Sequence, residues 1–201
     1  MPTAAILPTT RPFEILRNSN FAQGVISKGL VMPQSDQGIS RERYMLIPRV
    51  LIFVTRGDAV LLIKGAPTKR LWANKYNGVG GHVERGEDIH SAARRELLEE
   101  AGLQAELRLC GTVTVDADPT IGVGLYVFTG ELGPTNVSAP LRPSAEGTLE
   151  WLTTPGLTDQ PLVEDVAALL GRILPMRRED PPFAARSFYD PNGKLIVEFA
   201  E

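Results

Sequence analysis

Three glutamates lie close together in one short stretch of the chain, and together they could hold a metal ion. Glu96, Glu99 and Glu100 are three and four residues apart, so on a helix they share one face. Carboxylates crowded in this way repel one another, and a divalent cation reverses the sign of that interaction. Oxygen-only ligands suit Mg²⁺ or Mn²⁺, which bind carboxylates together with substrate phosphates. The spacing indicates phosphoryl or pyrophosphoryl chemistry; the alternative is a solvated acidic helix face.

The residues that precede these glutamates favour a ligand site over a plain acidic face. Gly80 and Gly81 are adjacent glycines, where a bare backbone can approach a ligand closely. Glu87 adds a fourth carboxylate just before the expected helix. Arg95 stands beside Glu96, and its guanidinium can hold a carboxylate by paired hydrogen bonds.

The whole run from Gly81 to Leu103 resembles the Nudix box, Gly-x5-Glu-x7-Arg-Glu-U-x-Glu-Glu-x-Gly-U, where U is an aliphatic residue. Every specified position of that pattern matches. The resemblance implies an α/β fold: an α/β/α sandwich around a mixed sheet, with the box forming a loop-helix-loop. It also implies hydrolysis of a nucleoside diphosphate linked to another moiety, with Mg²⁺ or Mn²⁺ as the cofactor.

The resemblance assigns roles to individual residues of the box. The metal ligands it implies are the Gly81 carbonyl, Glu87 (often through water), Glu96, Glu99 and Glu100. Arg95 would orient the catalytic glutamates. The general base varies within the family; Glu96 is our first choice, and Glu146, on a downstream loop, is the other candidate.

The stretch from Asn77 to Gly81 resembles that of MutT-type enzymes, which hydrolyse oxidised purine nucleoside triphosphates to the monophosphate and pyrophosphate. By that resemblance Asn77 hydrogen-bonds the base, since an amide both donates and accepts. The further correspondences are a stacking Trp151 and a base-reading acidic pair, Glu164 and Asp165. A basic cluster just before Asn77 consists of Lys64, Lys69 and Arg70. These side chains are either solvated on the surface or placed to receive the substrate's phosphates.

Other substrates stay open at this point. Pro119 lies sixteen residues beyond Leu103, close to where ADP-ribose hydrolases carry a proline, so ADP-ribose or a nucleotide sugar is the alternative. His82 replaces the lysine usual after the two glycines of the MutT-type group. A 5′-triphosphate RNA is less favoured by a sequence pI of about 5.5. An inactive Nudix binding module is the remaining reading, although every box glutamate is kept.

The elements that must position these residues follow from patterning. Residues 1–44 form a weakly structured extension, and residues 45–201 form the Nudix domain. Asp88 and Gly102 suit the caps of a helix between them. A second helix is expected at 163–174, and two alternating runs around Asp190-Pro191-Asn192-Gly193 predict a C-terminal hairpin. The remaining apolar runs predict strands at 45–55, 59–64, 105–115, 123–132 and 147–152.

Composition limits the remaining possibilities. The chain has 201 residues, of which 43% are hydrophobic, and a net charge of -3, so a sizeable core is expected and a nucleic-acid partner is not. Cys110 is the only cysteine, which excludes an internal disulfide. With no apolar run of membrane-spanning length and no secretory signal, we expect a cytoplasmic protein. The Nudix resemblance implies that its partner is a small nucleotide. Residues 1–44 could serve as an arm, a lid or a homodimer contact.

Overall fold

The computed structural model describes residues 38–40, 42–133, 141 and 146–201. The chain divides into two units, Met1–Ser40 and Arg41–Glu201, and the second is the folded domain described below. Most of the predicted extension (1–44) and of the 133–145 loop lies outside the described residues. No helix among the described residues has the length and hydrophobicity needed to cross a lipid bilayer.

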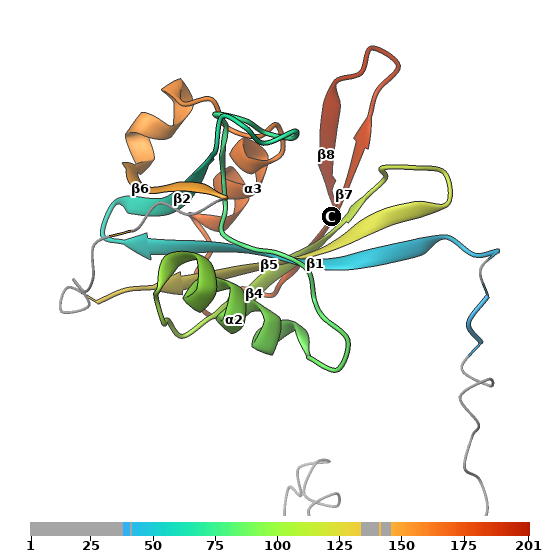
Figure 1. The fold of residues 1–201 in the computed structure, drawn as a ribbon, viewed down its shortest axis with the longest axis horizontal. Helices are drawn as coiled ribbons and strands as arrows, with labels where there is room; N and C mark the ends of the chain where they lie inside the picture. Colours follow the sequence, from blue (N-terminus) through green and yellow to red (C-terminus); the bar gives the residue numbers. More distant parts are fainter. Residues whose placement is uncertain (1–37, 41, 134–140, 142–145) are drawn as a thin grey trace, which may run out of the picture. The chain divides into compact units, whose positions relative to one another are not determined.

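One mixed sheet forms the centre of the domain (Figure 1). Seven strands follow one another in the order β3-β2-β1-β5-β4-β7-β8, and β6 pairs with the other edge of β2. β1 and β5 are parallel, as are β4 and β7, whereas the remaining neighbours are antiparallel. The strands are β1 (Met45–Arg56), β2 (Ala59–Gly65), β3 (Tyr76–Asn77), β4 (Arg108–Val115), β5 (Ile121–Glu131), β6 (Gly147–Thr153), β7 (Phe183–Tyr189) and β8 (Leu195–Phe199).

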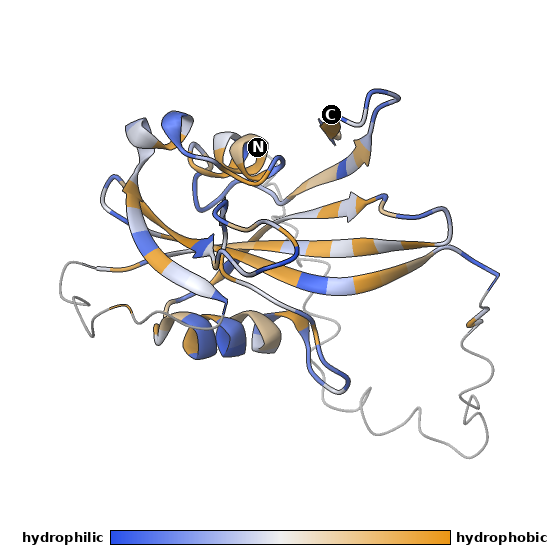
Figure 2. Cartoon of the chain, turned by 45° about the horizontal axis from the view of Figure 1, so that its top comes forward, coloured by the Kyte–Doolittle hydropathy of each residue, from blue (hydrophilic) through white to orange (hydrophobic). Residues whose placement is uncertain are grey.

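Helices cover both faces of this sheet, which explains the unbroken apolar run in β1. Leu51 and Phe53 face a core cluster shared with α3 (Val166–Ile173), whereas Val50, Ile52 and Val54 face one shared with α2 (Ile89–Ala101). A strand buried on both faces reads as continuously hydrophobic rather than alternating. Figure 2 shows this hydrophobic colouring along the central strands, and hydrophilic colouring on α2. The expected α/β/α sandwich is confirmed.

The ends of α2 are where the sequence predicts them. The Asp88 carboxylate accepts hydrogen bonds from the backbone N–H groups of His90 and Ser91, at 2.8 and 3.0 Å. Gly102 terminates the helix in the left-handed conformation, with φ of 66°, as a glycine C-cap does. Both caps are local in sequence, so the register of the box glutamates on this helix follows directly from the sequence.

The predicted start of the second helix is wrong by three residues. α3 begins at Val166 rather than at Val163, because the preceding residues pair with β3: the N–H of Tyr76 donates to Pro161 O and that of Val163 to Tyr76 O. β4 likewise begins at Arg108 rather than at residue 105. The short β3 and the 3₁₀ helix η3 (Thr154–Asp159) were not expected, whereas the C-terminal hairpin is confirmed as β7 and β8.

A divergence between β1 and β2 makes room for the two glycines. The two strands pair at Val54, Thr55 and Arg56, next to their hairpin turn. Farther along, β3 pairs with β2, and residues 79–83 then pair with β1: the N–H of Val50 donates to Gly81 O at 2.9 Å. The backbone is so close here that a Cβ at Gly80 would lie 2.1 Å from Val50 O. The Gly80-Gly81 segment is thus fixed between β1 and α2.

Candidate active site

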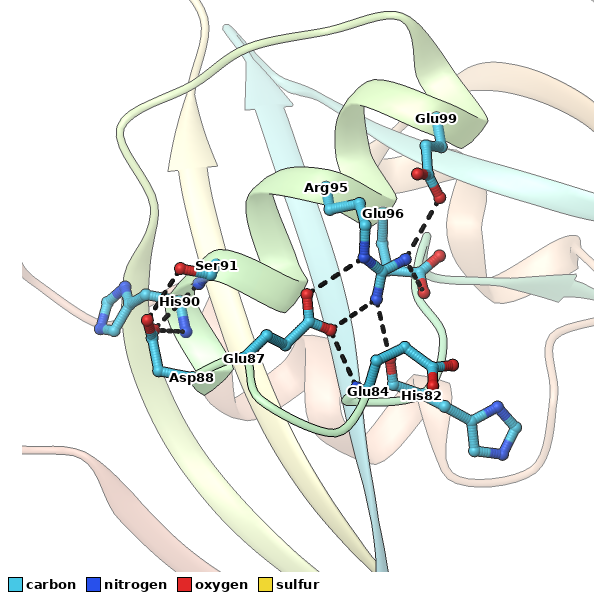
Figure 3. Close-up of polar contacts among 9 residues, drawn as sticks. All are labelled: His82, Glu84, Glu87, Asp88, His90, Ser91, Arg95, Glu96 and Glu99. Atoms are coloured by element: carbon cyan, nitrogen blue, oxygen red, sulfur yellow. Dashed lines mark hydrogen bonds and ion pairs between the residues drawn. The ribbon is translucent and has the colours of Figure 1, made fainter.

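Arg95 gathers the carboxylates of the box around its guanidinium group (Figure 3). It donates to Glu87 through Nε and Nη2, at 3.1 and 2.8 Å, and to Glu96 at 2.8 Å. Further bonds run to Glu99 at 3.2 Å and to the backbone carbonyl of His82 at 3.0 Å. The His82 imidazole itself points away from this cluster in Figure 3. Arg95 therefore fixes the loop before α2 to the carboxylates on α2.

The ion pair between Arg95 and Glu87 favours the charged form of both residues. Hydrogen bonds from Arg95 hold the pKa of Glu87 below its ordinary value, and a bond from the Glu84 N–H acts in the same direction. Bonds to Glu87 and then Glu96 raise the pKa of Arg95 further above its already high ordinary value. Arg95 is thus a permanent cation that orients carboxylates, as the box resemblance implies.

Glu96 and Glu100 converge on the two glycines. A Cβ added at Gly81 would lie 2.2 Å from Glu96 Oε1, so the absence of a side chain there lets this carboxylate sit against the backbone. Glu100 Oε2 accepts a hydrogen bond from the Gly80 N–H at 3.2 Å. Burial raises the pKa of Glu100 to about 7, and the charges of Glu96 and Glu146 act in the same direction. A cation beside Glu100 would offset both effects.

The donor set suits a hard divalent cation. Glu96, Glu99 and Glu100 provide carboxylate oxygens from one helix face, and Glu87 lies on the other side of Arg95. Gly81 O already accepts from Val50 but keeps a second lone pair. Among the described residues no three acidic or histidine side chains are already arranged as a finished cation site.

A pocket of about 70 Å³ opens beside this cluster, and Glu100 belongs to both. Three further predicted residues line it besides Glu100: Asn77, Lys69 and Glu146. Asn77 Oδ1 accepts from the N–H of Gly78 at 2.8 Å, so its Nδ2 is the group left to donate to a ligand. Lys69 forms an ion pair with Glu146. The other lining residues are Arg49, Ile63, Gly65, Trp72, Lys75, Gly78 and Gly80.

The other predicted substrate residues are not among the described residues that line this pocket. Trp151 lies on β6 opposite Leu61, with the Arg56 guanidinium 4.3 Å above its ring centre. Glu164 forms an ion pair with Lys75, which lowers the pKa of Glu164, so it reaches the pocket only through that lysine. Burial raises the pKa of Asp165, which precedes α3.

The sequence reasoning missed three pocket residues of suitable chemistry: Arg49, Trp72 and Lys75. Trp72 and Lys75 belong to the β2–β3 connection, which folds back on the end of β2. The Gly65 N–H donates to Lys75 O and the Asn74 N–H to Gly65 O, each at 2.9 Å. The available signal was their nearness to Asn77 along the chain; the fold-back itself has no local signature.

A family model described as the NUDIX domain matches residues 45–170, which contain the Arg95 cluster and all the described residues that line the pocket. The chain belongs to the Nudix family. Members of this family are hydrolases that act on pyrophosphate bonds of nucleotides, and they generally use divalent metal ions.

Two curated Nudix relatives match parts of the chain. An oxidized purine nucleoside triphosphate hydrolase from Danio rerio is 43% identical over 81 residues, which are 40% of this chain and 44% of the relative. An NAD-capped RNA hydrolase, NudC, from Pseudomonas aeruginosa is 33% identical over 92 residues, 44% of this chain and 32% of the relative. The chain thus spans less than half the length of these curated relatives.

The Nudix fold is also that of a solved neighbour. The crystal structure of the MutT protein from Bacillus halodurans superposes with a TM-score of 0.62 and 20% sequence identity. The match covers 77% of this chain and 97% of that one. At this identity the likeness concerns the fold, and the substrate has to be argued from the site.

Proposed function

We propose that this chain is a Mg²⁺- or Mn²⁺-dependent pyrophosphohydrolase that converts oxidised purine nucleoside triphosphates to the monophosphate and pyrophosphate. The observation that carries the proposal is the double position of Glu100. It is bonded to Gly80 within the carboxylate cluster, and it lines the pocket that contains Asn77. A nucleotide with its base at Asn77 would place its phosphates toward that cluster. The partial likeness to an oxidized purine nucleoside triphosphate hydrolase supports the same substrate class.

The residues divide the work of the reaction. Glu96, Glu99, Glu100 and the Gly81 carbonyl would hold the cation, with Glu87 in support, and Arg95 orients three of these carboxylates. The bound cation would neutralise the diphosphate and make a water more acidic. In hydrolysis a water would form a bond to phosphorus while the anhydride P–O bond breaks, and a carboxylate of the site would accept the proton of that water. Glu96 is our first candidate for this base, and Glu146, paired with Lys69, is the second.

A turnover panel tests the proposal. With Mg²⁺ present, 8-oxo-dGTP should give the highest kcat/KM among 8-oxo-dGTP, dGTP, ADP-ribose, a dinucleoside tetraphosphate, 5′-triphosphate RNA and NAD-capped RNA. Hydrolysis in H₂¹⁸O shows which phosphorus the water attacks: label in the monophosphate means the α-phosphorus, and label in pyrophosphate means the β-phosphorus. A Glu99→Gln, Glu100→Gln double variant that kept its turnover would contradict the metal assignment.

If a substrate other than 8-oxo-dGTP gave the highest kcat/KM, the result would identify a different activity. If ADP-ribose or a nucleotide sugar were cleaved best, the box chemistry would stand and the purine triphosphate assignment would be wrong. Preference for NAD-capped RNA would favour the activity named for the Pseudomonas aeruginosa relative. Tight nucleotide binding with no turnover of any substrate would identify a Nudix binding module.

A further inference from the structure

The chain has two tryptophans, and their surroundings differ sharply. Trp151 is partly buried against the α2-side core, and its ring is occupied by the Arg56 guanidinium. Trp72 lines the pocket that holds Asn77, and 37% of its surface is exposed. The tryptophan that reaches the pocket is therefore not the one that the sequence pattern singled out.

The backbone holds Trp72 in this position at a cost. Its φ is 61°, in the left-handed region, which is unfavourable for a bulky side chain. The turn is closed by the N–H of Lys75, which donates to Trp72 O at 3.1 Å. A Cβ on Gly65 would lie 2.4 Å from that same oxygen, so the loop needs a glycine at the end of β2. Strain that is kept by surrounding contacts points to a use for the side chain.

The chemistry around the ring fits a planar heteroaromatic group. Asn77 offers a hydrogen-bonding edge, and Trp72 offers a large flat face in the same pocket. Both lysines of this pocket pair with carboxylates rather than with the ring: Lys69 with Glu146 and Lys75 with Glu164. Arg49 lines the pocket together with Glu100, on the side of the carboxylate cluster.

We propose that Trp72 is the residue on which the nucleobase of the substrate stacks. By stacking, it would favour substrates that carry a nucleobase over anions that do not. The inference rests on the proposed nucleotide hydrolysis, and it assigns the base-stacking role to the β2–β3 loop instead of to β6. Stacking on an aromatic side chain tolerates any base, because every base has a π face. The hydrogen-bonding edge at Asn77 then has to supply discrimination among bases.

Intrinsic fluorescence gives a direct test, because each tryptophan can be observed alone. In Trp151→Phe only Trp72 emits, and in Trp72→Phe only Trp151 emits. Titration with a non-hydrolysable α,β-methylene dGTP should quench Trp72 emission and leave Trp151 emission within a few per cent. Inorganic pyrophosphate, which has no base, should quench neither. Calorimetric binding of the analogue without any quenching of Trp72 would overturn the inference.

Kinetic variants separate stacking from a structural role. Trp72→Gly removes the ring and also relieves the positive φ, so its Tm should not fall, whereas KM should rise about 5- to 100-fold. Trp72→Phe should recover most of that loss, and Trp151→Phe should keep the wild-type KM. A fall in Tm with unchanged KM in Trp72→Gly would make Trp72 a packing residue and overturn the inference.

Failure of the inference is distinguishable from failure of the proposed function. If wild-type protein hydrolyses nucleotides and Trp72→Gly does so with the same KM, only the stacking role of Trp72 is lost. If the wild type neither binds the analogue nor cleaves any member of the panel, the proposed function falls and the inference falls with it.

Discussion

Glu100 and Gly80, twenty residues apart in the chain, are joined by a hydrogen bond of 3.2 Å from the glycine N–H to the carboxylate. This contact attaches the C-terminal turn of α2 to the segment beside β1. It also brings a poorly solvated carboxylate next to Glu96, and burial, followed by that charge and the charge of Glu146, raises the pKa of Glu100 to about 7.

Glu100→Gln should therefore stabilise the metal-free protein in a pH-dependent way. The unfolded chain loses the Glu100 proton near the ordinary glutamate pKa of 4.5, but the folded chain keeps it until about pH 7. Between these values the folded state binds more protons, so wild-type stability falls as pH rises. The Tm advantage of the variant should grow from pH 4 to pH 7 and then level off. About 1 kcal/mol corresponds to roughly 2–4 °C for a domain of this size.

Differential scanning fluorimetry in EDTA measures this effect. Glu84→Gln, which neutralises an exposed carboxylate in the loop before α2, is the control and should show no such growth with pH. A Tm difference for Glu100→Gln that stays constant from pH 4 to pH 8 would mean that Glu100 titrates normally.

Alanine at Gly80 should mainly reduce the stability of the domain, whereas alanine at Gly81 should mainly reduce its activity. At Gly80 a Cβ would meet the Val50 carbonyl at 2.1 Å, and backbone cannot yield, so Gly80→Ala should lose about 1–3 kcal/mol. At Gly81 it would meet the end of the Glu96 side chain at 2.2 Å, which can turn aside. Gly81→Ala should therefore keep its fold and lose at least about tenfold in kcat. Urea denaturation and steady-state kinetics, measured on both variants, would refute this if the two behaved alike.

Arg95→Lys should impair catalysis although the charge is kept. A single ammonium cannot reproduce bonds to Glu87, Glu96 and Glu99 and to the His82 carbonyl together. We expect a loss of about 10- to 100-fold in kcat/KM, with weaker binding of Mn²⁺. Arg94→Lys, one residue earlier and exposed, is the matched control and should stay within about twofold. Equal activity of the two variants would show that carboxylate positioning by Arg95 is dispensable.

Charge reversal at Lys69 and at Arg70 distinguishes a specific contact in the pocket from a general effect of surface charge on nucleotide binding. Lys69 lines the pocket and pairs with Glu146, whereas Arg70 is exposed and is not among the described lining residues. Lys69→Glu should raise KM for an anionic nucleotide several-fold, more at low salt than at high salt. Arg70→Glu should leave KM within about twofold. A similar rise in both variants would indicate general attraction of the anion rather than a specific contact.

The parts of the site that are local in sequence could be predicted, and the parts assembled from distant segments could not. The caps Asp88 and Gly102 fix α2, and the box spacing then fixes which glutamates share its face. Arg95 was expected to orient carboxylates, and it contacts three of them. These relationships need only the helical repeat and hydrogen-bond geometry.

Trp72 and Trp151 show why the pocket residues were harder to predict from the sequence than the residues on α2. The resemblance to MutT-type enzymes favoured Trp151 as the stacking residue, and no motif in the sequence pointed to Trp72. Strand register decides otherwise: Leu149 pairs with Ile63, which lines the pocket, but Trp151 pairs with Leu61, two residues closer to the β1–β2 turn. The fold-back that carries Trp72 depends on Gly65 accepting a close backbone neighbour, which is visible only in three dimensions.

The separate origins of the two halves of the site affect how such a protein can change over generations. The carboxylates come mainly from α2, whereas Lys69, Trp72 and Lys75 come from the connection between β2 and β3. Backbone hydrogen bonds between Gly65, Asn74 and Lys75 hold the base of that connection. These bonds do not depend on which side chains stand at the loop tip. Insertions or substitutions in this loop can therefore change which substrates the pocket accepts, while the carboxylates on α2 stay in place.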